Sequence, residues 1–297
     1  MKILINLIGE QPIPNLLPIL YLKPAKTIIL YTATTEKTAK RIEKLTENCT
    51  KIIVEPYDIQ KFKNTISNLI NPNDEYFFNI TGGTKIMSVA LYEVALERKE
   101  EVIYFQSEGK ESILFNYKLN TIGTIIKDKI VIPELITADI YLRAHLWDYI
   151  SVTENQNNKD LGFIYEKEIA SILKSNNFEI IPNVKPKGEG NQLEIDLVLR
   201  LKGTNNVGLA EIKIGDKKEE GPKKGIDQLA LAGQREYLGT YTQRFLITSR
   251  ILSKQIKELA KAHHITVIDE ILQNKNDNKL TEDSKLKLIQ GITDKLR

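Results

Sequence analysis

A chain of 297 residues is long enough for two domains, each with its own hydrophobic core. With 41% hydrophobic and 27% charged residues, no run of ~20 apolar residues and no signal-peptide pattern, we expect a soluble, cytoplasmic protein without a membrane partner. A net charge of +3 means that any nucleic-acid site must be a local patch, and the single cysteine, Cys49, excludes an intramolecular disulfide.

The first third of the chain alternates short apolar runs with helical segments. Strands are predicted at 2–8, 26–33, 50–56, 75–81 and 100–106, and helices at 35–48, 58–70 and 84–98. This alternation favours parallel pairing in a doubly wound α/β sheet. The runs at 111–119 and 127–135 predict a hairpin at the far end of that sheet.

Composition places a boundary in the middle of the chain. We expect a first domain at 1–134, a connecting helix and linker at 135–160 and a second domain at 161–297. The second domain is predicted to contain, in order, a helix (161–177), three strands (178–184, 191–201, 205–215), a helix (225–238), a strand (243–249), a helix (253–263), a strand (265–269) and a partly helical tail (281–290).

Three polar loops follow predicted strands of the first domain. In an open α/β sheet, ligands bind outside the carboxyl ends of the strands. Glycines let backbone N–H groups approach a ligand, and the helix N-terminus after them favours an anion. The candidate ligand-binding residues are Gly9, Glu10, Gln11 and Asn15 in the first loop, Thr32, Thr34 and Thr35 in the second, and Asn79, Thr81, Gly82, Gly83, Thr84 and Lys85 in the third.

The third loop taken alone also fits an ordinary strand-to-helix turn. It matches neither GxxxxGK[ST] nor GxGxxG, so a Walker-type triphosphate site is not expected. The occurrence of all three loops favours ligand binding without naming the ligand.

Three sequence segments resemble the CARF domains of CRISPR-associated effector proteins. They are "LIGEQPIPN", "LYTATT" and "NITGGTKIM", and the resemblance spans roughly residues 1–130. It implies a Rossmann-like sensor that binds a cyclic oligoadenylate, often cyclic tetra-adenylate, across a homodimer. A two-fold ring of phosphates suits two copies of an anion-binding turn that face each other across a dimer axis.

Charged residues alternate along two predicted strands of the second domain. Residues two apart share a face, which places Glu194 beside Asp196 and Glu211 beside Lys213. If the strands are neighbours, the repulsion between Asp196 and Glu211 favours a Mg²⁺ or Mn²⁺ ion, which Glu166 (or Glu168) on the preceding helix would support. Lys213 would orient water or stabilise developing negative charge. The alternative is an antiparallel sheet with a solvated, charged face.

The order of these groups resembles the PD-(D/E)XK nuclease superfamily over about residues 160–270. "EID" and "EIK" match its two motifs, between a helix that carries Glu166 and a helix that carries Gln228. One departure is the absence of a proline before Asp196. The resemblance implies that Glu166, Asp196, Glu211, Lys213 and Gln228 are catalytic, with Asp196, Glu211 and Glu166 as metal ligands.

Together, the two resemblances imply a CARF sensor fused to a PD-(D/E)XK nuclease, the architecture of CRISPR type III accessory effectors. The expected function is cleavage of DNA, RNA or both, with little sequence specificity, activated by a cyclic oligoadenylate and dependent on Mg²⁺ or Mn²⁺. Two alternatives remain: a ligand-sensing regulator with an inactive nuclease-like domain, and a constitutive DNA-repair nuclease.

Overall fold

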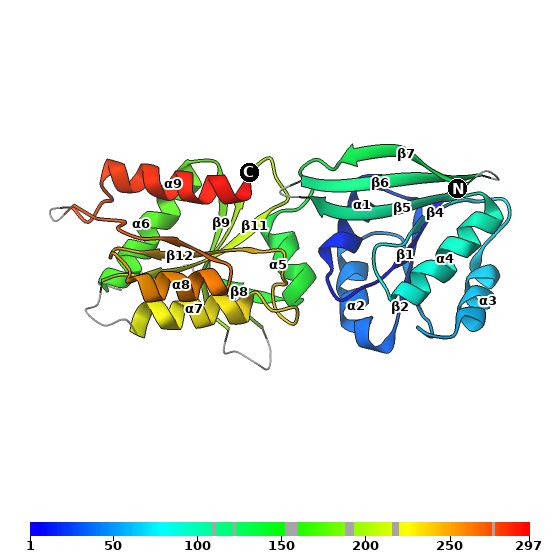
Figure 1. Cartoon of the computed structure of the whole chain (residues 1–297), viewed down its shortest axis with the longest axis horizontal. Coiled ribbons are helices and arrows are strands. Elements are labelled where there is room, and N and C mark those ends of the chain that lie inside the picture. Colours follow the sequence, from blue (N-terminus) through cyan, green and yellow to red (C-terminus); the bar gives the residue numbers. More distant parts are fainter. Residues whose placement is uncertain (109–110, 121–122, 152–159, 188–192, 216–219, 275–276) are drawn as a thin grey trace. The chain divides into compact units, whose positions relative to one another are not determined.

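The computed structural model describes residues 1–108, 111–120, 123–151, 160–187, 193–215, 220–274 and 277–297. The chain divides into two units, Met1–Leu135 and Ile136–Arg297, and each contains one β-sheet (Figure 1). Most of the predicted linker, residues 152–159, lies outside the described residues. In the described part of the chain, no helix combines the length and the apolar character needed to cross a membrane.

A seven-stranded sheet forms the centre of the first unit, in the order β3-β2-β1-β4-β5-β6-β7. Its first five strands are parallel, and β5, β6 and β7 pair antiparallel. The predicted doubly wound α/β sheet and its terminal hairpin are therefore confirmed. The strands are β1 (Lys2–Leu7), β2 (Lys26–Tyr31), β3 (Cys49–Ile53), β4 (Glu75–Asn79), β5 (Glu101–Glu108), β6 (Glu111–Asn120) and β7 (Gly123–Val131).

The helices of this unit are α1 (Ile13–Leu22), α2 (Glu36–Leu45), α3 (Ile59–Leu69) and α4 (Lys85–Arg98), with a short 3₁₀ turn at Ala33–Thr35. Apolar side chains of α3 and α4, such as Phe62 and Leu91, pack with Ile5 and Phe78 of the sheet in one buried core. Their burial removes apolar surface from water and fixes the carboxyl ends of β1 and β4.

Helix α1 corrects the prediction of a loop after the first strand. Pro14 lies in its first turn, where a missing N–H does no harm, and Pro18 lies inside the helix. The prolines hide the helical pattern in the sequence, and burial of residues such as Leu16 and Leu17 overcomes their unfavourable effect. Asn15 therefore belongs to the first turn of a helix.

The second unit contains a six-stranded sheet in the order β13-β12-β11-β10-β9-β8. Strands β8 (Tyr149–Ser151) to β11 are antiparallel, whereas β11, β12 and β13 are parallel. Helices α6 and α9 share one core on one face of this sheet, and Figure 1 shows α7 and α8 on the other side. The elements after β8 are α6 (Leu161–Ser175), β9 (Phe178–Pro186), β10 (Ile195–Leu201), β11 (Val207–Lys213), α7 (Glu220–Ala232), β12 (Gln243–Thr248), α8 (Lys254–Ala262), β13 (Ile265–Ile268) and α9 (Glu282–Leu296).

The helix expected within the connecting segment belongs to the second unit, Ile136–Arg297. Helix α5 (Ala138–Leu146) is anchored by Tyr141, whose buried hydroxyl donates to the carbonyl of Leu238 over 2.7 Å. Strand β8 (Tyr149–Ser151), which the sequence pattern did not predict, pairs with β9 as an edge strand.

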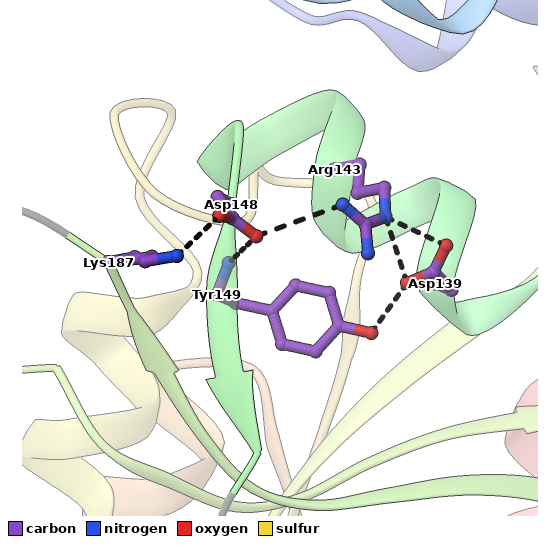
Figure 2. Close-up of polar contacts among 5 residues, drawn as sticks. All are labelled: Asp139, Arg143, Asp148, Tyr149 and Lys187. Atoms are coloured by element: carbon purple, nitrogen blue, oxygen red, sulfur yellow. Dashed lines mark hydrogen bonds and ion pairs between the residues drawn. The ribbon is translucent and has the colours of Figure 1, made fainter.

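A polar network joins α5 to this edge of the sheet (Figure 2). The Asp139 carboxylate accepts from Arg143 Nε at 2.9 Å and from the Tyr149 hydroxyl at 2.7 Å. The Asp148 carboxylate lies 3.1 Å from Lys187 Nζ and 3.7 Å from Arg143 Nη1. These contacts fix the orientation of α5 on the sheet of the second unit.

Candidate functional site

The turns after β1 and β4 touch each other at the centre of the first sheet. A Cβ added to Gly82 would lie 2.1 Å from the Leu7 carbonyl oxygen and 2.6 Å from Gly9 N, so only glycine fits there. Gly83 has a φ of 73°, a left-handed conformation that glycine adopts without strain. The two glycines therefore bring the backbone of the third loop directly against the first loop.

Buried asparagines hold these turns in shape. Asn79 Nδ2 donates to Asn6 Oδ1 over 2.7 Å, and Asn6 Nδ2 donates to the Asn15 carbonyl over 3.2 Å. Asn79 Oδ1 accepts from both N and Oγ1 of Thr81, whose hydroxyl oxygen in turn accepts from Phe105 N. In the structure, Asn79 and Thr81 thus support the turn. Asn6 was missed, although an asparagine inside the apolar run "ILINLI" was a usable signal.

The predicted threonines also form internal hydrogen bonds. Thr32 N donates to Thr35 Oγ1 over 3.0 Å, and the hydroxyls of Thr32 and Thr34 lie 2.9 Å apart. Thr84 is the N-cap of α4: its Oγ1 accepts from Met87 N and donates to the Pro56 carbonyl, both at 3.2 Å. These hydroxyls fix the loop conformations, and capping by Thr84 stabilises the start of α4.

Other groups around these turns remain available to a ligand. Lys85 is exposed in the first turn of α4. Both polar side-chain atoms of Gln11 and the Oδ1 atom of Asn15 are buried without a hydrogen-bond partner. Leaving such atoms unpaired costs about 1–3 kcal/mol each, so they favour a polar partner, which a water molecule or a ligand would supply. Glu10 contributes its carbonyl to the loop, accepting from Thr38 Oγ1.

The second unit brings Asp196, Glu211 and Lys213 together at one edge of its sheet. Leu197 of β10 pairs with Ala210 of β11, a register that sets Asp196 opposite Glu211. Lys213 Nζ lies 2.7 Å from Glu211 Oε2 and 3.4 Å from Asp196 Oδ2. The lysine ammonium thus bridges two carboxylates from neighbouring strands.

Burial disfavours the charged forms of the side chains in this cluster. The side chain of Glu211 is only 1% exposed, and burial together with the nearby Asp196 charge raises its pKa. Burial disfavours the charge of Lys213, but Glu211 and Asp196 outweigh it and raise the lysine pKa. Glu211 Oε1 is also buried without a partner. The cluster therefore favours additional positive charge beside the two carboxylates.

Glu166 and Gln228 approach the cluster from two helices. Burial and the Asp196 charge raise the pKa of Glu166, on α6, to about 7. A Cβ on Gly225 of α7 would lie 3.3 Å from Lys213 Cε, so this helix passes directly over the lysine. Gln228 follows on α7, and its Oε1 is buried without a partner.

Glu194 does not join the cluster, although it shares a strand face with Asp196 in the predicted pattern. Its carboxylate lies 3.0 Å from Lys185 Nζ, and its side chain is 48% exposed. This ion pair keeps the Glu194 charge at the surface.

The Glu166 pKa predicts a measurable pH dependence of stability. The native carboxyl keeps its proton to about pH 7, whereas the unfolded chain releases it near 4.5, so this group lowers stability as pH rises through that window. Glu166→Gln should therefore be more stable than the wild type at pH 8, by about 1 kcal/mol after allowing for partial exposure, and equal to it near pH 4.5. Thermal unfolding in EDTA at both pH values measures this, and a difference that does not grow with pH would contradict the assignment.

Asp196 and Glu211 offer part of a divalent-cation site. Among the described residues, no three histidine, cysteine or carboxylate side chains are grouped closely enough to hold a metal ion as they stand. Two facing carboxylates, one of them with an unpaired buried oxygen, nevertheless fit a hard cation such as Mg²⁺ or Mn²⁺. Glu166 remains a candidate third ligand.

Comparison with family models finds a match to the Card1 CARF domain at residues 3–135. Residues 3–135 form a CARF domain. Comparison of the sequence with curated proteins finds no match.

Solved structures share the fold of the whole chain at low sequence identity. Can2 from Sulfobacillus thermosulfidooxidans, solved with cyclic tetra-adenylate, has 15% identity, a TM-score of 0.75 and 100% coverage of both chains. Protein VC1899 from Vibrio cholerae has 12% identity, a TM-score of 0.69 and covers 99% of this chain and 97% of its own. A type III CRISPR defence DNA nuclease activated by cyclic oligoadenylate has 13% identity, a TM-score of 0.61 and covers 99% of this chain and 51% of its own. At these identities the likeness shows the fold alone.

The CARF domain also contains a hollow of about 540 Å³, and only some of the residues that line it were predicted from the sequence. Thr32, Thr34 and Thr84 line it together with Tyr57 and Lys61, which follow β3. Tyr57 is 74% exposed, an unusual state for a residue with a large aromatic side chain. An aromatic residue directly after a predicted strand, in "VEPYD", was the signal that could have identified it.

Proposed function

We propose that this protein is a nuclease of CRISPR antiviral defence that a cyclic oligoadenylate activates. Its CARF domain would bind the activator across a homodimer, and a PD-(D/E)XK domain at 161–297 would cut nucleic acid. The observation that carries the proposal is the buried Asp196–Glu211–Lys213 cluster in the same chain as a CARF domain.

The activator proposal rests on the chemistry of the turns after β1 and β4. Exposed Gly83 and Lys85 offer a backbone N–H and a positive charge for phosphates, and Gln11 offers unpaired polar atoms. The exposed ring of Tyr57, in the adjoining hollow, offers a stacking surface for a base. These features fit a ring of nucleotides, and Can2 was solved with cyclic tetra-adenylate on the same fold.

The cleavage proposal assigns a role to each residue of the second cluster. Asp196 and Glu211, with Glu166, would hold Mg²⁺ or Mn²⁺, which supplies Lewis-acid activation of the phosphodiester. Lys213 would orient water and stabilise the negative charge that develops on phosphate oxygens. Gln228 can orient water or a phosphate through its amide.

The decisive experiment incubates the full chain with labelled single- and double-stranded DNA and RNA and Mn²⁺, with and without cyclic tri-, tetra- and hexa-adenylate. We expect cleavage that requires both the metal and one of the rings, with cyclic tetra-adenylate as the expected activator. Binding of a ring without cleavage would favour the regulator with an inactive nuclease-like domain. Cleavage that ignores every ring would favour the constitutive repair nuclease.

Lys85→Ala should weaken binding of cyclic tetra-adenylate by about tenfold without changing stability, because the side chain is exposed and loses one charge–phosphate contact. Thr84→Ala should instead lower stability by about 1 kcal/mol, because it removes the N-cap of α4. Calorimetric titration and thermal unfolding of both variants separate these effects. Unchanged affinity in Lys85→Ala would remove this lysine from the site.

A further inference from the structure

The loop after β12 lies beside the proposed catalytic lysine. Strands β11 and β12 are parallel, with Lys213 paired to Thr248, so their carboxyl ends share one edge of the sheet. Ser249 N donates to the Lys213 carbonyl over 3.3 Å, and Gly215 N donates to Ser249 Oγ over 2.7 Å. The residue that follows Ser249 therefore lies near the Asp196–Glu211–Lys213 cluster.

Arg250 is the next residue, and its aliphatic stem lies against the backbone just beyond Lys213. A Cβ built on Gly215 would be 3.3 Å from Arg250 Cγ and 3.4 Å from Arg250 Cδ. Among the described residues, no ion pair with a carboxylate is found for its guanidinium. A guanidinium offers several donors in one plane and binds phosphate oxygens in pairs, so its charge is suited to a phosphodiester.

A basic hollow begins at the same loop and runs along α8. It has a volume of about 430 Å³, and its lining consists of Leu252, Lys254, Lys257, Glu258 and Lys261. The lysines recur at helical spacing and share one face, with Lys254 and Lys261 about 10 Å apart along the helix axis.

The acidic groups near these lysines leave the hollow with unneutralised positive charge. Asp269 lies 2.6 Å from Lys257 Nζ and largely compensates that lysine. Glu258 lies 3.9 Å from Lys254, but both side chains are well exposed, so the pair is weak. Within the described parts of the chain, Lys261 has no ion-pair partner.

We propose that Arg250, Lys254 and Lys261 bind the phosphate backbone of the nucleic-acid substrate. The bound strand would run along α8 to the Asp196–Glu211–Lys213 cluster. This inference rests on the proposed function and adds the surface that holds the substrate. Contacts to phosphates carry no base information, so the surface fits cleavage with little sequence specificity. It also places a local basic patch on a chain whose net charge is only +3.

The test measures binding separately from cleavage. Anisotropy of fluorescein-labelled 30-nucleotide DNA and RNA is followed with the full chain in EDTA and saturating cyclic tetra-adenylate, over a series of salt concentrations. Arg250→Gln and the double variant Lys254→Gln/Lys261→Gln should each weaken binding about tenfold. The slope of log affinity against log salt should fall by about 0.7 for each single-strand phosphate contact removed.

Two further variants control the experiment. Lys295→Gln removes an exposed lysine from α9 and should bind like the wild type with the same salt slope. Arg250→Lys keeps the charge and should retain more affinity than Arg250→Gln, which separates charge from packing on Gly215. Equal melting temperatures would show that the variants are folded.

The outcomes distinguish this inference from the proposed function. If the wild type binds and cuts nucleic acid while the Arg250 and lysine variants bind equally well, the surface is wrong and the nuclease assignment stands. If the wild type neither binds nor cuts with any ring, the proposed function fails, and the substrate surface fails with it.

Discussion

Asp196→Asn and Lys213→Ala are each expected to lower the rate of nucleic-acid cleavage by a factor of about 10²–10³, which removes detectable activity. Asp196→Asn keeps the size of the side chain and an oxygen that can accept from Ile212 N, now 2.7 Å from Asp196 Oδ2, but removes one negative charge. It should therefore also lose Mn²⁺ binding. Lys213→Ala leaves both carboxylates in place and removes the ammonium between them, so Mn²⁺ binding should persist.

Cleavage assays on the activated enzyme and calorimetric titration with Mn²⁺ measure these two effects. Glu194→Gln provides a matched control, since it neutralises an exposed carboxylate two residues from Asp196 that pairs with Lys185. It should cut at close to the wild-type rate. Affinity for cyclic tetra-adenylate should be unchanged in all three variants, because the substitutions lie outside the CARF domain. Wild-type cleavage by either catalytic variant would make the inactive-domain regulator the better hypothesis.

Gly82→Ala should destabilise the CARF domain by about 3 kcal/mol and abolish activator binding. The added methyl group would meet the Leu7 carbonyl oxygen at 2.1 Å and Asn15 Oδ1 at 2.6 Å, so the backbone of two turns must move apart. Overpacking of this kind typically costs about 1–3 kcal/mol, and backbone neighbours cannot rotate away as a flexible side chain can. Differential scanning calorimetry, with and without cyclic tetra-adenylate, measures both consequences.

Gly221→Ala is the matched control for this substitution. A Cβ at Gly221 has no neighbour within 4 Å, and the residue lies in α7, where alanine favours the helix. Its melting temperature should be equal to or slightly above that of the wild type. A Gly82→Ala protein that melts like the wild type and still binds the activator would show that the two turns are not closely packed in solution.

Several features of the fold could be predicted because they depend on local patterns. Alternating apolar strands and helices in the first third determine a parallel sheet, and the two last runs of that unit determine its hairpin. Helix α1 was missed because Pro14 and Pro18 interrupt its pattern, while burial of its apolar residues decides the conformation. Strand β8 was missed because three residues carry too little periodicity, and pairing with β9 decides it.

The sequence by itself determined which residue types are available for chemistry: the "EID" and "EIK" strands and the glycine-rich turn before α4. Only the tertiary structure decided how they combine. The antiparallel register of β10 and β11 sets Asp196 against Glu211, and burial then raises the pKa of Glu211. Likewise, Thr84 is occupied as a helix cap, and parallel pairing of β11 and β12 brings the stem of Arg250 against Gly215, two residues after Lys213. Such contacts join residues far apart in the chain, and their energies depend on distance and burial, which no local pattern contains.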